Sequence, residues 1–194
     1  MVNLLDPKEA EGFVRREFAQ SPDRLLHILE VAKRVQSSAK KLSALFPDNP
    51  DWPDLAYCAA LLHDIGYIEE AVDSGFHPID GCKYLGKRGY HNLGQLIVGH
   101  SNSPEQAGLL GIDGVIASDD LIAKLITYWD VQVLQGGQVV DYDTRFNEIV
   151  ARYGDNHIVS QAHFLARPRI EKILAEVDEL LDKTTLEMNS LAVD

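Results

Sequence analysis

Four histidines and two aspartates spread along this 194-residue chain are of the residue types that hold transition-metal ions in proteins. In chain order they are His27, His63, Asp64, His77, His100 and Asp130. Neutral imidazole and carboxylate groups are good ligands for iron, manganese, cobalt, nickel and zinc. A carboxylate has two oxygens, so Asp64 can bridge a pair of ions, which an imidazole cannot do. We therefore expect chemistry that depends on two divalent first-row metal ions.

No member of this set is specific on its own. A single histidine on a partly apolar face, such as His27, is more often a packed or surface residue, and His100 can simply interact with a helix dipole. Asp130 is different because it lies in the apolar run LITYWDVQVL. An unpaired carboxylate buried in such a run is costly, and a metal ion would offset that cost. The set as a whole therefore favours a metal site.

Helices are the elements that must position these residues, because apolar residues recur with helical period in nearly every segment. Asp6-Pro7 and Ser21-Pro22 are helix-start signals. A long helix should follow through His27 to about residue 45, and the next should end at His63-Asp64-Ile65-Gly66. Gly66 is expected to be a left-handed cap of that helix.

The remaining segments predict shorter helices and two at the end of the chain. We expect helices from His77 to Gly89, over 91–100, and from a cap at Ser118 or Asp119 to Val133. Alternating apolar residues around Gly136-Gly137 indicate a possible small hairpin near 133–142. The prediction is an all-α bundle in a single domain over 1–194. Its parts are a metal-site core over about 20–135, C-terminal helices over about 143–183 (near 146–153 and 158–181) and a frayed tail over 185–194.

Composition excludes several classes of protein. The net charge of −12 and the absence of a basic stripe argue against nucleic-acid polymers as partners. No run reaches the roughly 18 apolar residues that cross a bilayer, and the first residues lack the features of a signal peptide. We therefore expect a cytoplasmic protein that binds no membrane. No Gly-x-Ser-x-Gly elbow or Walker loop is present in the sequence.

Five segments of the chain resemble the HD-domain superfamily of metal-dependent phosphohydrolases. The stretch CAALLHDIGY is similar to its His-Asp-Ile-Gly signature, RLLHILEVAKRV to its first-histidine helix and LIAKLITYWDVQV to its last-aspartate helix. FHPIDGCKYL and LIVGHSNS resemble the two extra histidine segments of members with two metal ions. The resemblance covers roughly residues 20–135.

This resemblance implies a role for each matched residue. The first ion would be held by His27, His63, Asp64 and Asp130, and Asp64 would bridge to a second ion held by His77 and His100. His63, Asp64 and Asp130 would be the catalytic residues. Most members of the superfamily hydrolyse phosphate esters, commonly of nucleotides. Two ions that share a bound water lower its pKa, supply hydroxide and neutralise phosphoryl charge, so a small phosphorylated substrate is expected.

The sequence departs from the family pattern at Tyr67, where many members carry a phosphate-binding lysine. Another group must then bind the anionic part of the substrate. The candidates, each of which can also be a solvated or helix-end residue, are Tyr67 itself, Arg24, Lys83, Lys87, Lys124, Ser101 and Asn102. Outside the pattern, Asp80 is considered as an acceptor that orients His77 and Trp129 as a pocket residue, while His163 is expected to be an ordinary core or surface histidine.

Three functions fit the residues. The first is a metal-dependent phosphohydrolase that uses a metal-bound hydroxide on a nucleotide or small metabolite. The second is a di-iron oxygenase acting on a small organic substrate, because a minority of proteins that resemble this family use the same ligands to activate dioxygen. The third is a non-catalytic ligand-binding module, against which the complete set of ligands argues.

Overall fold

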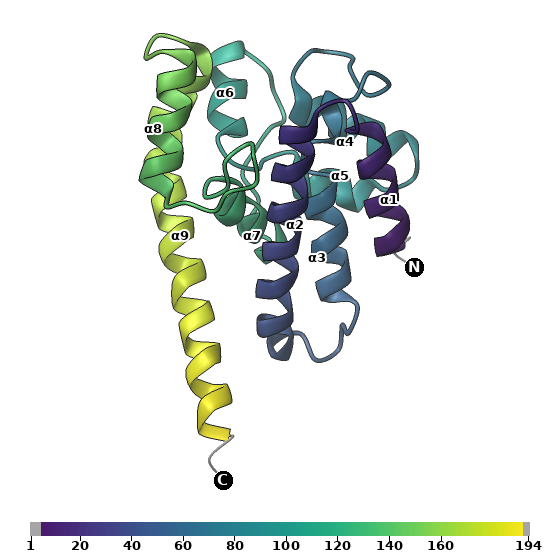
Figure 1. Ribbon diagram of the computed structural model, residues 1–194, viewed down its shortest axis with the longest axis vertical. Helices are drawn as coiled ribbons and strands as arrows, with labels where there is room; N and C mark the ends of the chain where they lie inside the picture. The colour runs from purple at the N-terminus through teal and green to yellow at the C-terminus, as the bar shows by residue number, and fades with distance from the viewer. Residues whose placement is uncertain (1–4, 192–194) are drawn as a thin grey trace.

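Helices make up almost all of the molecule (Figure 1). The structure is a computed structural model that describes residues 5–191, and the side chains of residues 5–186. Within that range it contains nine α-helices, two short 3-10 helices and no strand, which confirms the all-α prediction. The elements are α1 (Pro7–Glu17), α2 (Pro22–Leu42), η1 (Ser43–Leu45), α3 (Trp52–Leu61), η2 (Ile65–Tyr67), α4 (His77–Lys87), α5 (His91–Ile97), α6 (Ser103–Leu110), α7 (Leu121–Asp130), α8 (Tyr142–Tyr153) and α9 (Ile158–Leu191).

Short polar side chains start several of these helices. Asp6 accepts hydrogen bonds from the backbone N–H groups of Lys8 and Glu9, at 2.9 and 3.0 Å, so the predicted start of α1 is correct. The predicted cap of α7 at Ser118 or Asp119 is wrong. Asp120 is the cap, because its carboxylate accepts from the backbone N–H of Ile122 at 2.8 Å.

Helix α2 lies at the centre of the bundle and packs against α3, α7 and α9. Its buried face carries Ile28, Val31, Ala32 and Val35, all fully buried and spaced by three or four residues. His27 lies beside Ile28 at the start of this face. The first predicted ligand is therefore fixed on a helix that is held from three sides.

Gly66 allows α4 to begin directly against η2. A methyl group at Gly66 would lie 1.9 Å from the backbone oxygen of His77 and 2.7 Å from the backbone nitrogen of Gly81. The prediction of a left-handed cap is wrong, because Gly66 is not among the residues with positive φ. The glycine is required instead by the close approach of two backbones, which brings His77 beside Asp64.

A tight turn follows α5 and places His100 beyond the end of the helix. Helix α5 ends at Ile97 rather than extending to residue 100 as predicted. Ser101 has a positive φ of 50°, which is unusual for a residue with a side chain. Its backbone N–H donates to the Thr127 hydroxyl at 3.1 Å, and Arg169 donates to its carbonyl oxygen at 2.6 Å. Helices α7 and α9 thus hold this turn in place.

The predicted hairpin near 133–142 is reduced to a single antiparallel bridge between Val133 and Val139. The backbone N–H groups of Leu134 and Val140 donate to Gln138 and Gln132, at 2.9 and 2.8 Å. Strands do not develop, because Asp141 at once caps α8 by accepting from the Thr144 backbone.

The last two helices lie side by side, and α9 also packs against α2, α6 and α7 (Figure 1). The predicted frayed tail over 185–194 is wrong as far as Leu191, because α9 continues to that residue, and 192–194 lie outside the described residues. Side chains support the late turns: the Thr184 hydroxyl donates to the Leu180 carbonyl at 2.9 Å, and Lys183 pairs with Glu179. None of the described helices has both the length and the apolar character needed to cross a membrane. The assignment of the chain to one domain stays a prediction.

Candidate metal centre

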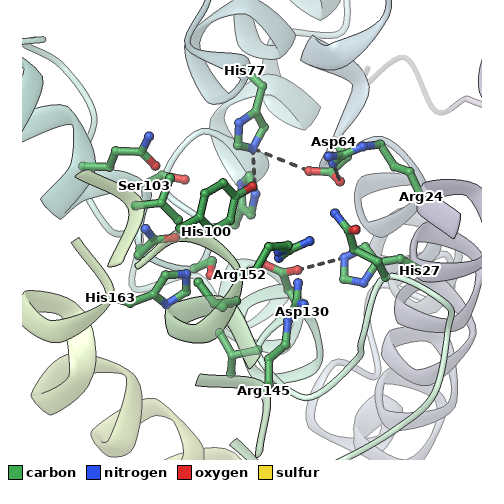
Figure 2. Close-up of a pocket in the computed structure, with 18 of the residues that line it drawn as sticks. Arg24, His27, Asp64, His77, His100, Ser103, Asp130, Arg145, Arg152 and His163 are labelled. Carbon is green, nitrogen blue, oxygen red and sulfur yellow. Dashed lines mark hydrogen bonds and ion pairs between the residues drawn. The ribbon is translucent and has the colours of Figure 1, made fainter. Parts of the chain in front are cut away.

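The predicted ligands lie together around one cavity (Figure 2). Five of the six line it, namely His27, Asp64, His77, His100 and Asp130. His63 lies directly behind them and is fully buried. The six residues come from α2, the end of α3, the start of α4, the turn after α5 and the end of α7. Elements distant in sequence therefore meet at one site.

The reactive atoms of these side chains lie close together. Asp64 Oδ1 is 3.8 Å from His63 Nε2 and 3.5 Å from His77 Nε2. Asp130 Oδ1 is 3.9 Å from His63 Nε2 and 3.0 Å from His27 Nε2.

Backbone carbonyl groups orient three of the rings through Nδ1. A carbonyl oxygen only accepts, so each Nδ1 donates. For His63 and His100 this leaves Nε2 of the neutral form of the ring with its lone pair toward the cavity. His27 differs, because its Nε2 also makes a hydrogen bond with Asp130 Oδ1 at 3.0 Å. The three contacts are His27 to Leu134 at 3.3 Å, His63 to Ala60 at 2.7 Å and His100 to Ile97 at 2.5 Å.

Neighbouring groups keep the two aspartates ionised, and burial keeps His77 and His100 neutral. Burial raises the pKa of Asp64 and Asp130, but the surrounding histidines, together with the Arg24 guanidinium at Asp64, outweigh it and hold both pKa values well below the usual range. Burial lowers the pKa of His77 to about 3 despite the nearby Asp64 carboxylate, and it also lowers the pKa of His100. Ionised carboxylates and neutral imidazoles are the forms that bind metals.

The arrangement fits metal ions. The groups His27–His63–Asp130 and His63–Asp64–His100 each offer ligand atoms within 4.8 Å of one another. His63 belongs to both groups, and its buried Nε2 has no hydrogen-bond partner. An unpartnered buried nitrogen is costly, and a cation between these groups would satisfy it. The division of the ligands between two ions stays a prediction.

Arg24, Tyr67 and His77 form a stack at the edge of the cavity. The Tyr67 ring lies 4.1 Å from the His77 ring, and the Arg24 guanidinium carbon lies 3.7 Å from the Tyr67 ring centre. Arg24 also donates to Asp64 Oδ2 at 2.5 Å. Tyr67 thus stabilises the position of His77 by stacking on its ring, and it stabilises the position of Asp64 through its contact with Arg24.

The remaining predicted substrate contacts divide into two groups. Ser101 and Asn102 line the cavity. Lys83, Lys87 and Lys124 do not, so their predicted place in the pocket is wrong. Lys83 is exposed and pairs with Asp73 at 2.9 Å, Lys124 pairs with Glu176 at 2.9 Å, and Lys87 is exposed.

Two further expectations near the site are also wrong. Asp80 does not orient His77, because it accepts hydrogen bonds from Ser74 and from the Gly75 backbone in the loop before α4. Trp129 faces away from the cavity and donates to the Ser38 hydroxyl at 3.0 Å.

Sequence reasoning missed a second wall of the cavity, to which α8 contributes Arg145 and Arg152 and α9 contributes His163. His163 is buried and lines the cavity rather than being an ordinary core or surface histidine. One signal was available: Arg145, Ile149 and Arg152 are spaced so that they share one face of a helix.

The sequence pattern of the HD domain family matches residues 24–133, which is more than half of the chain. The chain therefore belongs to the HD domain family, a family of the metal-dependent hydrolase type. All six predicted ligands lie within the matched segment, whereas Arg145, Arg152 and His163 lie beyond it. No match was found among curated proteins or among solved structures.

Proposed function

We propose that this protein is a metal-dependent phosphohydrolase that cleaves a phosphate ester of a nucleotide or small metabolite. The observation that carries the proposal is the pair of overlapping donor groups that share His63, whose Nε2 is buried without a partner. The same cavity holds the guanidinium groups of Arg24, Arg145 and Arg152, which favour an anionic substrate over a neutral one.

The six predicted ligands would hold two divalent ions. When bound, such ions supply a deprotonated water at neutral pH and neutralise charge on phosphoryl oxygens. The chain's own residues prepare this site in three ways. Backbone carbonyls keep Nε2 of His63 and His100 directed inward, Arg24 holds Asp64 ionised and in position, and Tyr67 packs flat on His77.

The first experiment is elemental analysis of the purified protein, followed by a panel of phosphate esters with inorganic phosphate release as the readout. We expect close to two ions per chain, and turnover of at least one ester that stops when metal is chelated. Asp64→Ala should lower turnover by more than about 100-fold, because this carboxylate lies beside both His63 and His77.

Asp73→Ala is the matched control, because Asp73 is an exposed aspartate that pairs with Lys83 away from the cavity. Unchanged turnover in Asp64→Ala would contradict the proposal. Oxygen consumption with iron and an organic substrate, without phosphate release, would assign the chain to the di-iron oxygenases instead. Protein that takes up no metal even after reconstitution would leave a ligand-binding module.

A further inference from the structure

The wall of the cavity formed by α8 and α9 carries polar groups that the metal centre does not use. Arg145, Arg152 and His163 enter from these helices and line the cavity together with Asn102 from the turn before α6. In Figure 2, Arg145 lies on the side of Asp130 away from His77 and Asp64, and His163 lies to the left of Asp130. Within residues 5–186, no hydrogen bond or ion pair joins Arg145, Arg152 or His163 to a predicted metal ligand.

Three of these four residues contain a buried atom that lacks a hydrogen-bond partner. The atoms are Asn102 Nδ2, Arg145 Nε and His163 Nδ1, in residues that are only 8%, 8% and 5% exposed. Buried polar atoms in folded proteins nearly always have partners. Ordered water or a bound ligand would supply the missing bonds, and the chemistry of these atoms and the charge beside them favour an anion.

The missing partner must accept hydrogen bonds. A guanidinium nitrogen and an amide –NH₂ only donate, so Arg145 and Asn102 both require an acceptor. Burial, together with the charges of Arg145 and Arg152, lowers the pKa of His163 to about 4 against the opposing effect of Asp130. His163 is therefore neutral at pH 7, and its ring can also donate. Several donors around one space suit an anion with several oxygens.

The positive charge on this wall of the cavity also favours a negatively charged ligand. Arg145 and Arg152 pair with the same carboxylate, Glu148, at 2.6 and 3.4 Å. Arg145, Arg152 and Glu148 together thus leave one positive charge on the α8 side of the cavity, facing a cavity that also contains the Asp130 carboxylate, in a chain whose net charge is −12. An oxyanion would balance this excess and would be bound by charge-assisted hydrogen bonds.

We propose that Asn102, Arg145, Arg152 and His163 form a distal anion site, which binds a second phosphate group of the substrate apart from the group at the metal centre. A phosphate presents its oxygens in a tetrahedral arrangement, which suits donors that enter from the turn before α6, from α8 and from α9, whereas the two oxygens of a carboxylate lie in one plane. The identity of the bound group as part of a substrate rests on the proposed function, but the binding of an oxyanion does not.

The first test is calorimetric titration of metal-free protein with inorganic phosphate, with acetate as the comparison anion. We expect phosphate to bind without metal and acetate to bind more weakly. Arg152→Gln should weaken phosphate binding by about 10-fold or more, since it removes one charged donor. Arg145→Lys should weaken it too while keeping a positive charge in this buried position.

Arg167→Gln is the control, because Arg167 pairs with Asp143 and Glu171 outside the cavity. Thermal melts of all variants separate lost binding from lost folding. Phosphate binding that is equal in wild type, Arg152→Gln and Arg145→Lys, or that requires metal, would overturn the distal anion site. Equal binding of phosphate and acetate would indicate a general anion site, and it would also overturn the proposal of a distal site for phosphate.

The second test compares phosphate esters that carry one anionic group with esters that carry two. Arg152→Gln should raise KM for the doubly anionic esters by about 10-fold and leave kcat unchanged, since only binding is altered. A fall in kcat on every ester would place Arg152 at the reacting phosphate and overturn the proposal. If no ester turns over but metal-free binding depends on Arg152, the distal anion site stands and the phosphohydrolase proposal falls.

Discussion

At the scale of single residues, the site depends on how the histidine rings are turned. His63 and His100 both donate from Nδ1 to the carbonyl oxygen three residues earlier in the chain. This local bond fixes the orientation of the ring before any partner from another element arrives. The same hydrogen bond occurs at both histidines, so both rings present Nε2 rather than Nδ1 to the cavity.

His63→Ala should lower the metal content to less than half of the wild-type value, because His63 belongs to both donor groups. His91→Ala is the matched control, since His91 is exposed and outside the cavity. Elemental analysis of both variants after equal metal loading and desalting measures the difference. Equal metal content in the two variants would show that the ions bind elsewhere.

Prediction from sequence at this scale worked best where the signal was local. The six ligands could be proposed because each lies in a short recognisable segment, and the fold brings their side chains together. Lys83 and Lys124 were placed in the pocket only by their distance along a helix from a ligand. Their true partners, Asp73 and Glu176, come from a separate loop and a separate helix, which helical spacing does not reveal.

At the scale of elements, the junction of η2 and α4 decides where His77 lies. The two backbones approach so closely at Gly66 that no side chain fits between them. Gly66→Ala should therefore destabilise the protein by about 1–3 kcal/mol and lower its metal content, because α4 must move away from Asp64.

Gly12→Ala is the comparison variant, because here the same substitution should stabilise the protein rather than destabilise it. Gly12 lies inside α1 with nothing within 4 Å of an added methyl group, so alanine should stabilise the helix by up to about 1 kcal/mol. Denaturant unfolding of both variants measures the two effects. Stability losses of equal size would mean that the close approach at Gly66 is not what matters.

The loop before α4 predicts a dependence of stability on pH. Burial raises the pKa of Asp80, but hydrogen bonds from Ser74 and Gly75 outweigh it and lower the pKa below its ordinary value. A carboxyl group with a lowered pKa contributes stability that is complete above its unfolded pKa of about 4 and is lost as the pH falls through the folded value. Asp80→Asn should therefore lower the melting temperature at pH 7, and the difference from wild type should shrink below about pH 4. A difference that is constant from pH 7 to pH 3 would contradict this assignment.

Elements were predictable to the extent that their ends carry polar or glycine signals. The start of α1 at Asp6 was clear, whereas the end of α9 was not, because its late turns are supported by Thr184 and Lys183 rather than by a burial pattern. The wall formed by α8 and α9 could be predicted only in part. The spacing of Arg145 and Arg152 puts them on one helix face, but no local pattern encodes the packing that brings this face and His163 beside the metal centre.

At the scale of the whole molecule, metal binding should be coupled to stability. A ligand that binds only the folded chain stabilises it, by about 2.7 kcal/mol when its free concentration is 100 times Kd. For a chain of this length, a chelator should lower the melting temperature by about 5–10 °C. The His63→Ala variant should show little further decrease with chelator, because it has already lost metal. Calorimetric melts with and without chelator test this, and equal decreases in both proteins would contradict it.

The packing of α9 against α2, α6, α7 and α8 also bears on the choice of substrate. The predicted metal ligands all lie before residue 131, while the second wall of the cavity is supplied by residues after 140. Three of the four residues of the proposed distal anion site thus lie in a stretch of the chain that contains none of the predicted metal ligands. In the proposed phosphohydrolase, substitutions after residue 140 would therefore alter which substrate binds while leaving every predicted metal ligand in place.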